Sequence, residues 1–204
     1  MLQLGVCYYP EQWPASIWRD DAKKMAELGV RWVRIAEFSW SSVEPSEGDF
    51  TWDWLDQVIQ ILGEEGLEVV MCTPSAAPPK WLVDREPSIL PVDENGVTRK
   101  FGARRHYCFS SQVYLRESAR ICEAYAKRYG NNQYVKAWQV DNEYGDHDSC
   151  FSYSEEAKLQ FRLWLAERYT DIESLNAAWG TSFWSTHYNN FDQIELSHNM
   201  VDAP

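Results

Sequence analysis

YVKAWQVDNEYG, residues 134 to 145, runs from a strand-like apolar pattern straight into polar residues. The first part, up to Val140, has the β-branched and aromatic content of a short strand. Asp141, Asn142 and Glu143 follow at once, and Gly145 lets the chain turn. In barrels of parallel strands the chemistry lies at the carboxyl ends of the strands. The three polar residues therefore stand where such a barrel would keep its active site.

Three similar units precede this stretch. Each begins with a short β-rich segment that leads through a loop into an amphipathic helix. The strands are predicted at residues 2–10, 31–40 and 67–74. The helices are predicted from Ser16, a candidate N-cap, to a stop at Gly29, and over residues 52–65 and 112–129. Before the last helix, a hairpin turn is predicted at residues 93–96.

Strands that alternate with helices predict βα units around a parallel sheet. Only about four units fit before Tyr169, whereas a closed barrel needs ~250 residues. A helix near residues 155–169 and a Trp-rich tail follow, without a further clear strand. No repeat or linker marks a second domain. We therefore expect residues 1–204 to form one α/β catalytic domain, the N-terminal half or more of a (β/α)8 TIM barrel that is incomplete in this chain.

Composition narrows the classes of function. The formal net charge of −12 argues against a nucleic-acid partner, because phosphate binding depends on Lys and Arg. There is no leader, and no apolar run approaches the ~20 residues that span a bilayer, so we expect a cytoplasmic protein with no membrane partner. The 5 scattered cysteines, an odd number, argue against a disulfide framework.

The polar triplet suggests a specific chemistry. Glycoside hydrolysis commonly uses two carboxyl groups, one of which gives a proton to the leaving oxygen. Glu143, at a strand end and among aromatic residues, suits that proton donor, and Asn142 could hold a sugar 2-hydroxyl. The alternative is that Asp141 and Glu143 are a solvated strand end. For an Asn-Glu pair taken alone, that alternative is favoured because such pairs are common.

Five segments give this pair a context. Together they closely resemble the β-galactosidases of glycoside hydrolase family 42, in order and over essentially the whole chain: GVCYYPEQWP at residues 5–14, RWVRIAEFSWSSVEPSEGDFTWDWLD at 31–56, CTPSAAPPKWL at 72–82, RRHYC at 104–108 and WQVDNEYG at 138–145. The resemblance implies a TIM-barrel domain that hydrolyses terminal β-D-galactosides with retention. It also implies a homo-oligomer, commonly a trimer.

The resemblance assigns roles to single residues. Glu143 matches the catalytic acid/base, and Asn142 matches the neighbouring residue that contacts the sugar. Arg34 and Arg104 look like contacts to sugar hydroxyls, and Trp184 looks like the aromatic wall near the galactose. Each also has a structural alternative: Arg34 could pair with a structural carboxylate, Arg104 could serve its loop, and Trp184 could belong to the core.

The resemblance leaves one catalytic role without a residue. The family's nucleophile is a glutamate on a later barrel strand, which residues up to Pro204 do not reach. Retaining enzymes hold their two carboxyl groups only ~5 Å apart, so the partner of Glu143 must come from downstream sequence. Because the nucleophile lies outside these residues, we expect the 204-residue chain alone to be inactive.

Glu37 is a weaker candidate for the wall of the site.

Some family members hold zinc through one cysteine after the RRHY run and three cysteines after NEYG. A structural zinc site normally closes four ligands, most often Cys or His. Here two positions keep cysteine, while the other two carry a hydroxyl and a carboxylate. We expect no required cofactor and disfavour zinc, whose weak candidate ligands are Cys108 and Cys150, with Ser152 and Glu155 in the other two positions and His106 and His147 nearby.

Two other functions stay open beside hydrolysis of a β-galactoside. A related barrel of the same clan could act on another sugar, such as a β-mannoside or β-glucoside, since the Asn-Glu pair is shared across that clan. A truncated, non-catalytic fragment could act only as a binding or assembly module. The CYYPEQWP and RRHYC matches favour galactose, and activity of the isolated chain would separate an enzyme from a module.

Overall fold

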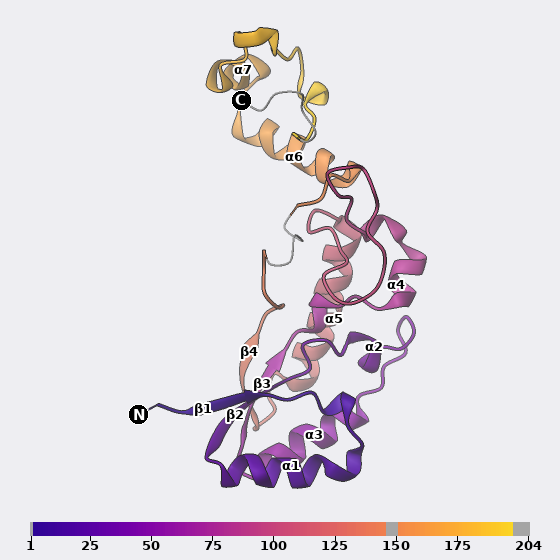
Figure 1. The fold of residues 1–204 in the computed structure, drawn as a ribbon, viewed down its shortest axis with the longest axis vertical. Helices are drawn as coiled ribbons and strands as arrows, with labels where there is room; N and C mark the ends of the chain where they lie inside the picture. The colour runs from indigo at the N-terminus through magenta and orange to yellow at the C-terminus, as the bar shows by residue number, and fades with distance from the viewer. Residues whose placement is uncertain (1, 146–150, 198–204) are drawn as a thin grey trace.

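The computed structural model describes residues 2–145 and 151–197. Its strands are β1 (Leu4–Cys7), β2 (Val30–Ile35), β3 (Glu68–Cys72) and β4 (Val135–Gln139) (Figure 1). Its α-helices are α1 (Ala15–Glu27), α2 (Trp40–Val43), α3 (Asp53–Glu64), α4 (Lys80–Arg85), α5 (Gln112–Tyr129), α6 (Glu155–Arg168) and α7 (Ile172–Trp179). Short 3₁₀ turns are η1 (Pro10–Gln12), η2 (Pro74–Ala76), η3 (Pro87–Ile89), η4 (Phe183–Ser185) and η5 (Phe191–Gln193). None of the helices in these two ranges is long and apolar enough to cross a membrane.

The four strands form one parallel sheet in the order β1-β2-β3-β4. Helices α1, α3 and α5 each connect one strand to the next, which confirms the predicted βα units. Parallel strands need such crossovers, because a tight turn cannot return the chain to the same end of the sheet. All four carboxyl ends therefore lie along one edge of the sheet.

Two predicted boundaries are wrong. The second strand ends at Ile35, not near residue 40, because Ala36 turns the chain with a φ of 74° and Trp40 starts α2. The indole of Trp40 is completely buried, so the aromatic-rich segment after Ile35 forms a packed turn and does not continue the strand. Helix α1 begins directly after Pro14, which occupies the N-cap position predicted for Ser16.

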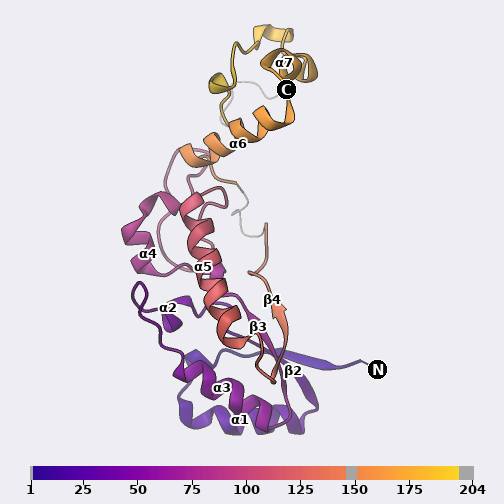
Figure 2. The same cartoon turned by 180° about the vertical axis from the view of Figure 1, so that it is seen from behind.

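Alternate residues of the central strands face opposite ways. Val33, Ile35, Val69 and Met71 are almost fully buried in the core shared with the helices. Figures 1 and 2 place α1, α3 and α5 along one side of the strands. The other face carries side chains such as Arg34, which is only partly buried. One face of the sheet is thus closed by helices, and the opposite face remains available for polar contacts.

A buried carboxylate fixes the loop that follows β2. Glu44 is 0% exposed and accepts hydrogen bonds from the Trp40 indole at 2.9 Å, from the Gly48 amide at 2.7 Å and from Arg120 at 2.8 Å. Its backbone oxygen accepts from the Trp81 indole at 2.9 Å. A charged group is tolerated inside a protein only when it is paired and hydrogen-bonded in this way. Glu44 therefore ties the loop after β2 to α4 and α5.

Beyond residue 151 the chain builds a second, smaller cluster. Leu165, Ile172, Leu175 and Ile194 are buried together between α6 and the segments that follow it. Both views place α6 and α7 at the end of the molecule opposite α1 and α3 (Figures 1 and 2). Helix α6 confirms the helix predicted near residues 155–169, whereas α7 was not predicted.

Gly63 is the place where α3 approaches the start of β4. A Cβ at this position would lie 2.2 Å from carbons of the Tyr134 ring. Glycine to alanine inside a helix usually stabilises by about 1 kcal/mol. We expect the opposite sign for Gly63→Ala, a loss of about 1–3 kcal/mol, because overpacking forces the ring or the strand to shift. The thermal unfolding midpoint of the full-length protein measures this.

Gln57→Ala, at an exposed position of the same helix, is the matched control and should leave the midpoint nearly unchanged. A higher midpoint for Gly63→Ala than for the unmodified protein would show that the close approach does not constrain the fold.

Candidate active site

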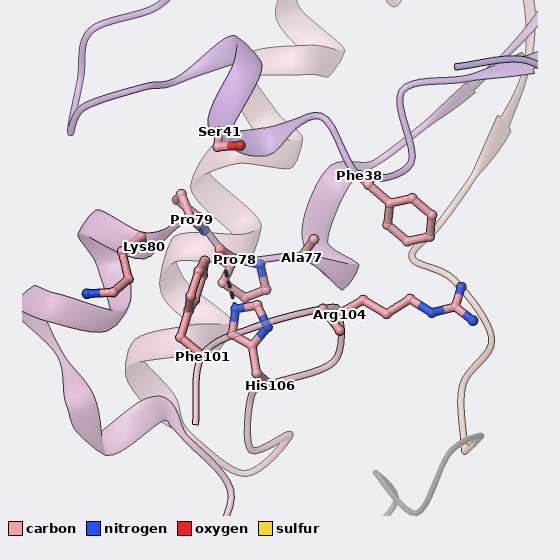
Figure 3. A pocket seen from close by; sticks show the side chains of 10 residues that line it. Phe38, Ser41, Ala77, Pro78, Pro79, Lys80, Phe101, Arg104 and His106 are labelled. Atoms are coloured by element: carbon pink, nitrogen blue, oxygen red, sulfur yellow. Dashed lines mark hydrogen bonds between the residues drawn. The ribbon is translucent and has the colours of Figure 1, made fainter. Parts of the chain in front are cut away.

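Glu143 and Arg104 form an ion pair beyond the end of β4. Oε2 of Glu143 lies 2.8 Å from Nη2 of Arg104, and their side chains are 45% and 34% exposed. The Arg104 guanidinium also lies 5.5 Å from the ring centroid of Phe38. Figure 3 shows Arg104 extended alongside Phe38, with its guanidinium pointing away from His106. A half-exposed carboxyl group with a cation beside it can meet a ligand that enters from solvent.

Asn142 adds a donor that nothing in the described ranges uses. The residue is only 5% exposed, and its Oδ1 accepts from Gln139 Nε2 at 3.3 Å. Its Nδ2 has no hydrogen-bond partner among the described residues. Leaving a buried donor unpaired costs about 1–3 kcal/mol, so such a group is normally reserved for water or a ligand. Next to Glu143, this amide suits a hydroxyl oxygen of a sugar.

Asp141 is not a solvated strand end. It is 4% exposed, and its carboxylate accepts four hydrogen bonds: from the Ser75 hydroxyl at 2.8 Å, the Tyr107 hydroxyl at 3.3 Å, the Tyr114 hydroxyl at 3.4 Å and the backbone N–H of Asn142 at 2.6 Å. Burial raises the pKa of both tyrosines, so they remain neutral donors. The alternative of a solvated strand end is therefore wrong for Asp141, whose structural role no sequence signal indicated.

Arg34 is held inside a network that crosses the sheet. Its Nη2 lies 2.5 Å from Glu37 Oε2, and its Nη1 donates to Gln139 Oε1 at 2.8 Å. Glu37 is 3% exposed and also accepts from the Tyr9 hydroxyl at 2.5 Å. Burial lowers the pKa of Arg34, but Glu37, Tyr9 and the thiols of Cys7 and Cys72 together outweigh this effect, and the pKa is raised. This pairing matches the alternative in which Arg34 meets a carboxylate, and its sugar contact stays a prediction.

Trp184 is not brought to Glu143 within this chain. It lies in η4, where it is 63% exposed, has a φ of 57° and packs against Phe183 with a centroid separation of 4.9 Å. In both views the segment after α7 lies at the far end of the molecule from the sheet. Its exposure contradicts the alternative that Trp184 belongs to the core. Its proposed role beside galactose remains a prediction.

The weak zinc candidates do not assemble in the described residues. Cys150 and His147 lie outside the described ranges. Cys108 is buried with its Sγ 3.5 Å from Ser154 Oγ, and the side chain of Glu155 is 86% exposed. Across residues 2–145 and 151–197, no group of three or more His, Cys, Asp or Glu side chains could hold a metal.

A largely apolar pocket of about 590 Å³ adjoins the ion pair. Burial lowers the pKa of His106, and its Nε2 lies 2.9 Å from the carbonyl oxygen of Pro78. Figure 3 shows the side chains that line the pocket, with Lys80 at the side away from Arg104. Its lining includes Phe38, Pro78, Pro79, Phe101, Arg104 and His106.

Arg105 is the residue that sequence reasoning missed. It is 4% exposed, and its Nη1 donates to the backbone oxygen of Asn142 at 2.5 Å and to that of Glu143. The sequence offers two consecutive arginines, and nothing in their spacing tells which one turns inward. Only the fold distinguishes their roles: Arg104 pairs with the carboxyl group of Glu143, whereas Arg105 donates to the backbone oxygens of Asn142 and Glu143.

Known proteins match this chain along its full length. The model of the family described as β-galactosidase, glycoside hydrolase family 42, matches residues 7–204. A β-galactosidase of Thermus thermophilus is 54% identical over 201 residues, which cover 98% of this chain and 31% of the relative. A β-galactosidase of Halorubrum lacusprofundi is 49% identical, with 95% and 28% covered. The chain thus spans roughly a third of the length of these relatives.

Solved structures agree. The crystal structure of β-galactosidase from the psychrophilic Marinomonas ef1 superposes with a TM-score of 0.97 at 52% identity, covering 100% of this chain and 31% of that one. The β-galactosidase from Bacillus circulans sp. alkalophilus gives a TM-score of 0.93 at 32% identity, with 99% and 29% covered. These similarities and the four-stranded parallel sheet confirm the expected partial barrel. The chain belongs to glycoside hydrolase family 42, the family of β-galactosidases.

Proposed function

We propose that this chain supplies the acid/base side of the active site of a retaining β-galactosidase, with Glu143 as the acid/base. The observation that carries the proposal is the half-exposed Glu143 carboxyl group paired with Arg104, in a residue that directly follows Asn142 with its buried, unpaired Nδ2. Glu143 would protonate the glycosidic oxygen as its bond to the sugar breaks, and would later take a proton from the attacking water. The related proteins bear the name β-galactosidase, which supports galactose over other sugars.

The nucleophile of the reaction needs a second carboxyl group ~5 Å from the first. Glu37 and Asp141 are buried and already accept hydrogen bonds, so neither is free to attack an anomeric carbon. We therefore assign the nucleophile to a glutamate in a part of the barrel that this chain does not span. For the same reason we expect the isolated 204-residue chain to be inactive.

Three further residues bind the substrate in this proposal. The Arg104 guanidinium would donate to sugar hydroxyls beside Glu143, and Asn142 Nδ2 would donate to the 2-hydroxyl, a contact that strengthens in the transition state. Arg34 would contact the sugar only through those guanidinium N–H donors that are not already used by Glu37 and Gln139. Its main contribution would then be to hold the strand ends in register.

We also propose a homo-oligomer, a trimer by family resemblance. Trp184 and Phe183 are 63% and 69% exposed in η4, and the segment after α7 lies at the end of the molecule far from the sheet (Figure 1). Large exposed aromatic side chains that lie together commonly mark contact surfaces. Trp184 would then reach a galactose only in the site of a neighbouring copy. The β-galactoside is the proposed small-molecule partner.

A cytoplasmic role in carbohydrate metabolism is part of the proposal. Cys7, Cys72, Cys108 and Cys122 are free thiols. Free thiols persist most readily in a reducing compartment, which supports the cytoplasm. We propose further that neither zinc nor another cofactor is required for this chemistry, because acid/base and nucleophilic carboxyl groups carry it alone.

Glu143→Gln tests the proposed function in the full-length enzyme. Substrates with poor leaving groups should lose about 10²–10⁴-fold in kcat/KM, because they need the proton most. Activated aryl galactosides should lose less, and azide should restore turnover by trapping the glycosyl-enzyme. Glu155→Gln, at a carboxylate whose side chain is 86% exposed, is the matched control. Equal losses on both substrate types, without azide rescue, would refute the acid/base assignment.

Arg104→Ala should raise the inhibition constant of galactose about tenfold or more, because a charged hydrogen bond is lost. Trp184→Ala should raise it as well if the neighbouring copy brings that ring to the sugar. Inhibition of the full-length enzyme by galactose measures both, and Arg116→Ala, at an exposed position of α5, serves as control. A lower unfolding midpoint with unchanged inhibition would instead indicate a structural role for either residue.

Cys108→Ser tests the absence of a zinc requirement. We expect the full-length enzyme to contain less than one zinc per chain and the variant to keep the same unfolding midpoint. Elemental analysis and thermal unfolding measure the two quantities. One tightly bound zinc per chain, released by this substitution, would contradict the expectation, because structural zinc contributes directly to folding.

A further inference from the structure

The two consecutive arginines of the RRHY run have opposite surroundings. Arg104 is about one-third exposed and meets the carboxyl group of Glu143. Arg105 is 4% exposed and donates through Nη1 to the backbone oxygens of Asn142 and Glu143. Its own amide donates to the carbonyl of Ala76, just after β3, at 2.9 Å. Arg105 therefore links the loop after β3 to the backbone of the two residues proposed to act on the sugar.

The backbone that Arg105 holds is in an unfavourable conformation. Glu143 has a φ of 49°, in the left-handed region that most non-glycine residues avoid, and Asp141 has a φ of 57° in the same region, which aspartate tolerates better. Such conformations persist only where the surroundings over-determine them, and they concentrate at functional sites. Here the backbone oxygens of Asn142 and Glu143 both accept from Nη1 of Arg105, and these two hydrogen bonds hold the conformation in place. They fix the peptide planes on both sides of the Glu143 Cα atom, and with them the direction of its side chain.

Asp141 fixes the preceding peptide from the other side. Its carboxylate accepts from the Asn142 amide at 2.6 Å and is itself anchored by Ser75 at 2.8 Å. Three consecutive peptide units, from Asp141 to Tyr144, are thus held by one buried anion and one buried cation. Neither of these two side chains points to solvent. They are suited to orient the acid/base and not to bind a ligand.

We propose that Arg105 is a positioning residue for catalysis, which holds the backbone of Asn142 and Glu143 so that the acid carboxyl group meets the glycosidic oxygen. The inference rests on the proposed function, because it assumes that Glu143 is the acid/base. A misplacement of about 1 Å in a catalytic group can cost about 100-fold in rate. Removal of Arg105 should therefore weaken proton transfer while binding of the galactose ring is largely retained.

The test compares Arg105→Met and Arg105→Lys with Arg104→Met in the full-length enzyme. Arg105→Met should lower kcat/KM for alkyl galactosides about 100-fold, with a much smaller loss on activated aryl galactosides and little change in galactose inhibition. Arg105→Lys keeps a charged donor and should recover part of the loss. Arg104→Met should instead raise the inhibition constant of galactose. If Arg105→Met does not fold, Arg105→Lys against the unmodified enzyme carries the same comparison of leaving groups.

Equal losses on both substrate types would overturn the proposal, since a purely structural role affects all substrates alike. A galactose inhibition constant raised as much as in Arg104→Met would overturn it as well, because Arg105 would then be a binding residue. Failure of the proposed function is distinguishable: it would show as a Glu143→Gln variant without leaving-group selectivity, whatever Arg105 does.

Discussion

The buried carboxylate of Asp141 is the contact on which the site depends. It joins the loop after β3 through Ser75, the segment before α5 through Tyr107, the first turn of α5 through Tyr114 and the end of β4 through the Asn142 amide. Three stretches of the chain, at residues 75, 107–114 and 141–142, therefore share one acceptor. Arg105 completes the arrangement with a buried positive charge beneath the adjacent carbonyls. Hydrogen bonds to each side chain offset part of the cost of burying its charge.

Two other buried carboxylates, Glu44 and Glu37, are stabilised by hydrogen bonds and ion pairs in the loop after β2. Glu44 is buried behind the loop after β2, where indole and amide donors and Arg120 satisfy it. Glu37 is buried at the end of that strand beside Arg34 and Tyr9. In a chain of net charge −12, these carboxylates are not surface charges but internal acceptors that organise loops. Fully satisfied buried networks of this kind make the loops that carry them more rigid.

Much of the fold could be predicted because helix and strand periodicities reflect which face is buried. The run from Tyr134 to Gly145 revealed both a strand and its polar end, and the structure places β4 there. The end of β2 could not be predicted, since the turn at Ala36 depends on the burial of Trp40 against distant elements. The same limit applies to the site. Consecutive arginines look alike in sequence, and only tertiary packing sends Arg105 inward.

The exposed edges of the sheet have a consequence for the order of folding. β1 has little burial, with Leu4 52% exposed, and its parallel ladder to β2 uses only one of its edges. In a closed eight-stranded barrel, the first strand also pairs with the last. The residues of β1 must then wait until the last strand of the domain has been synthesised before their ladder closes. Contacts of such long sequence separation slow folding, so barrel closure becomes a late step during synthesis.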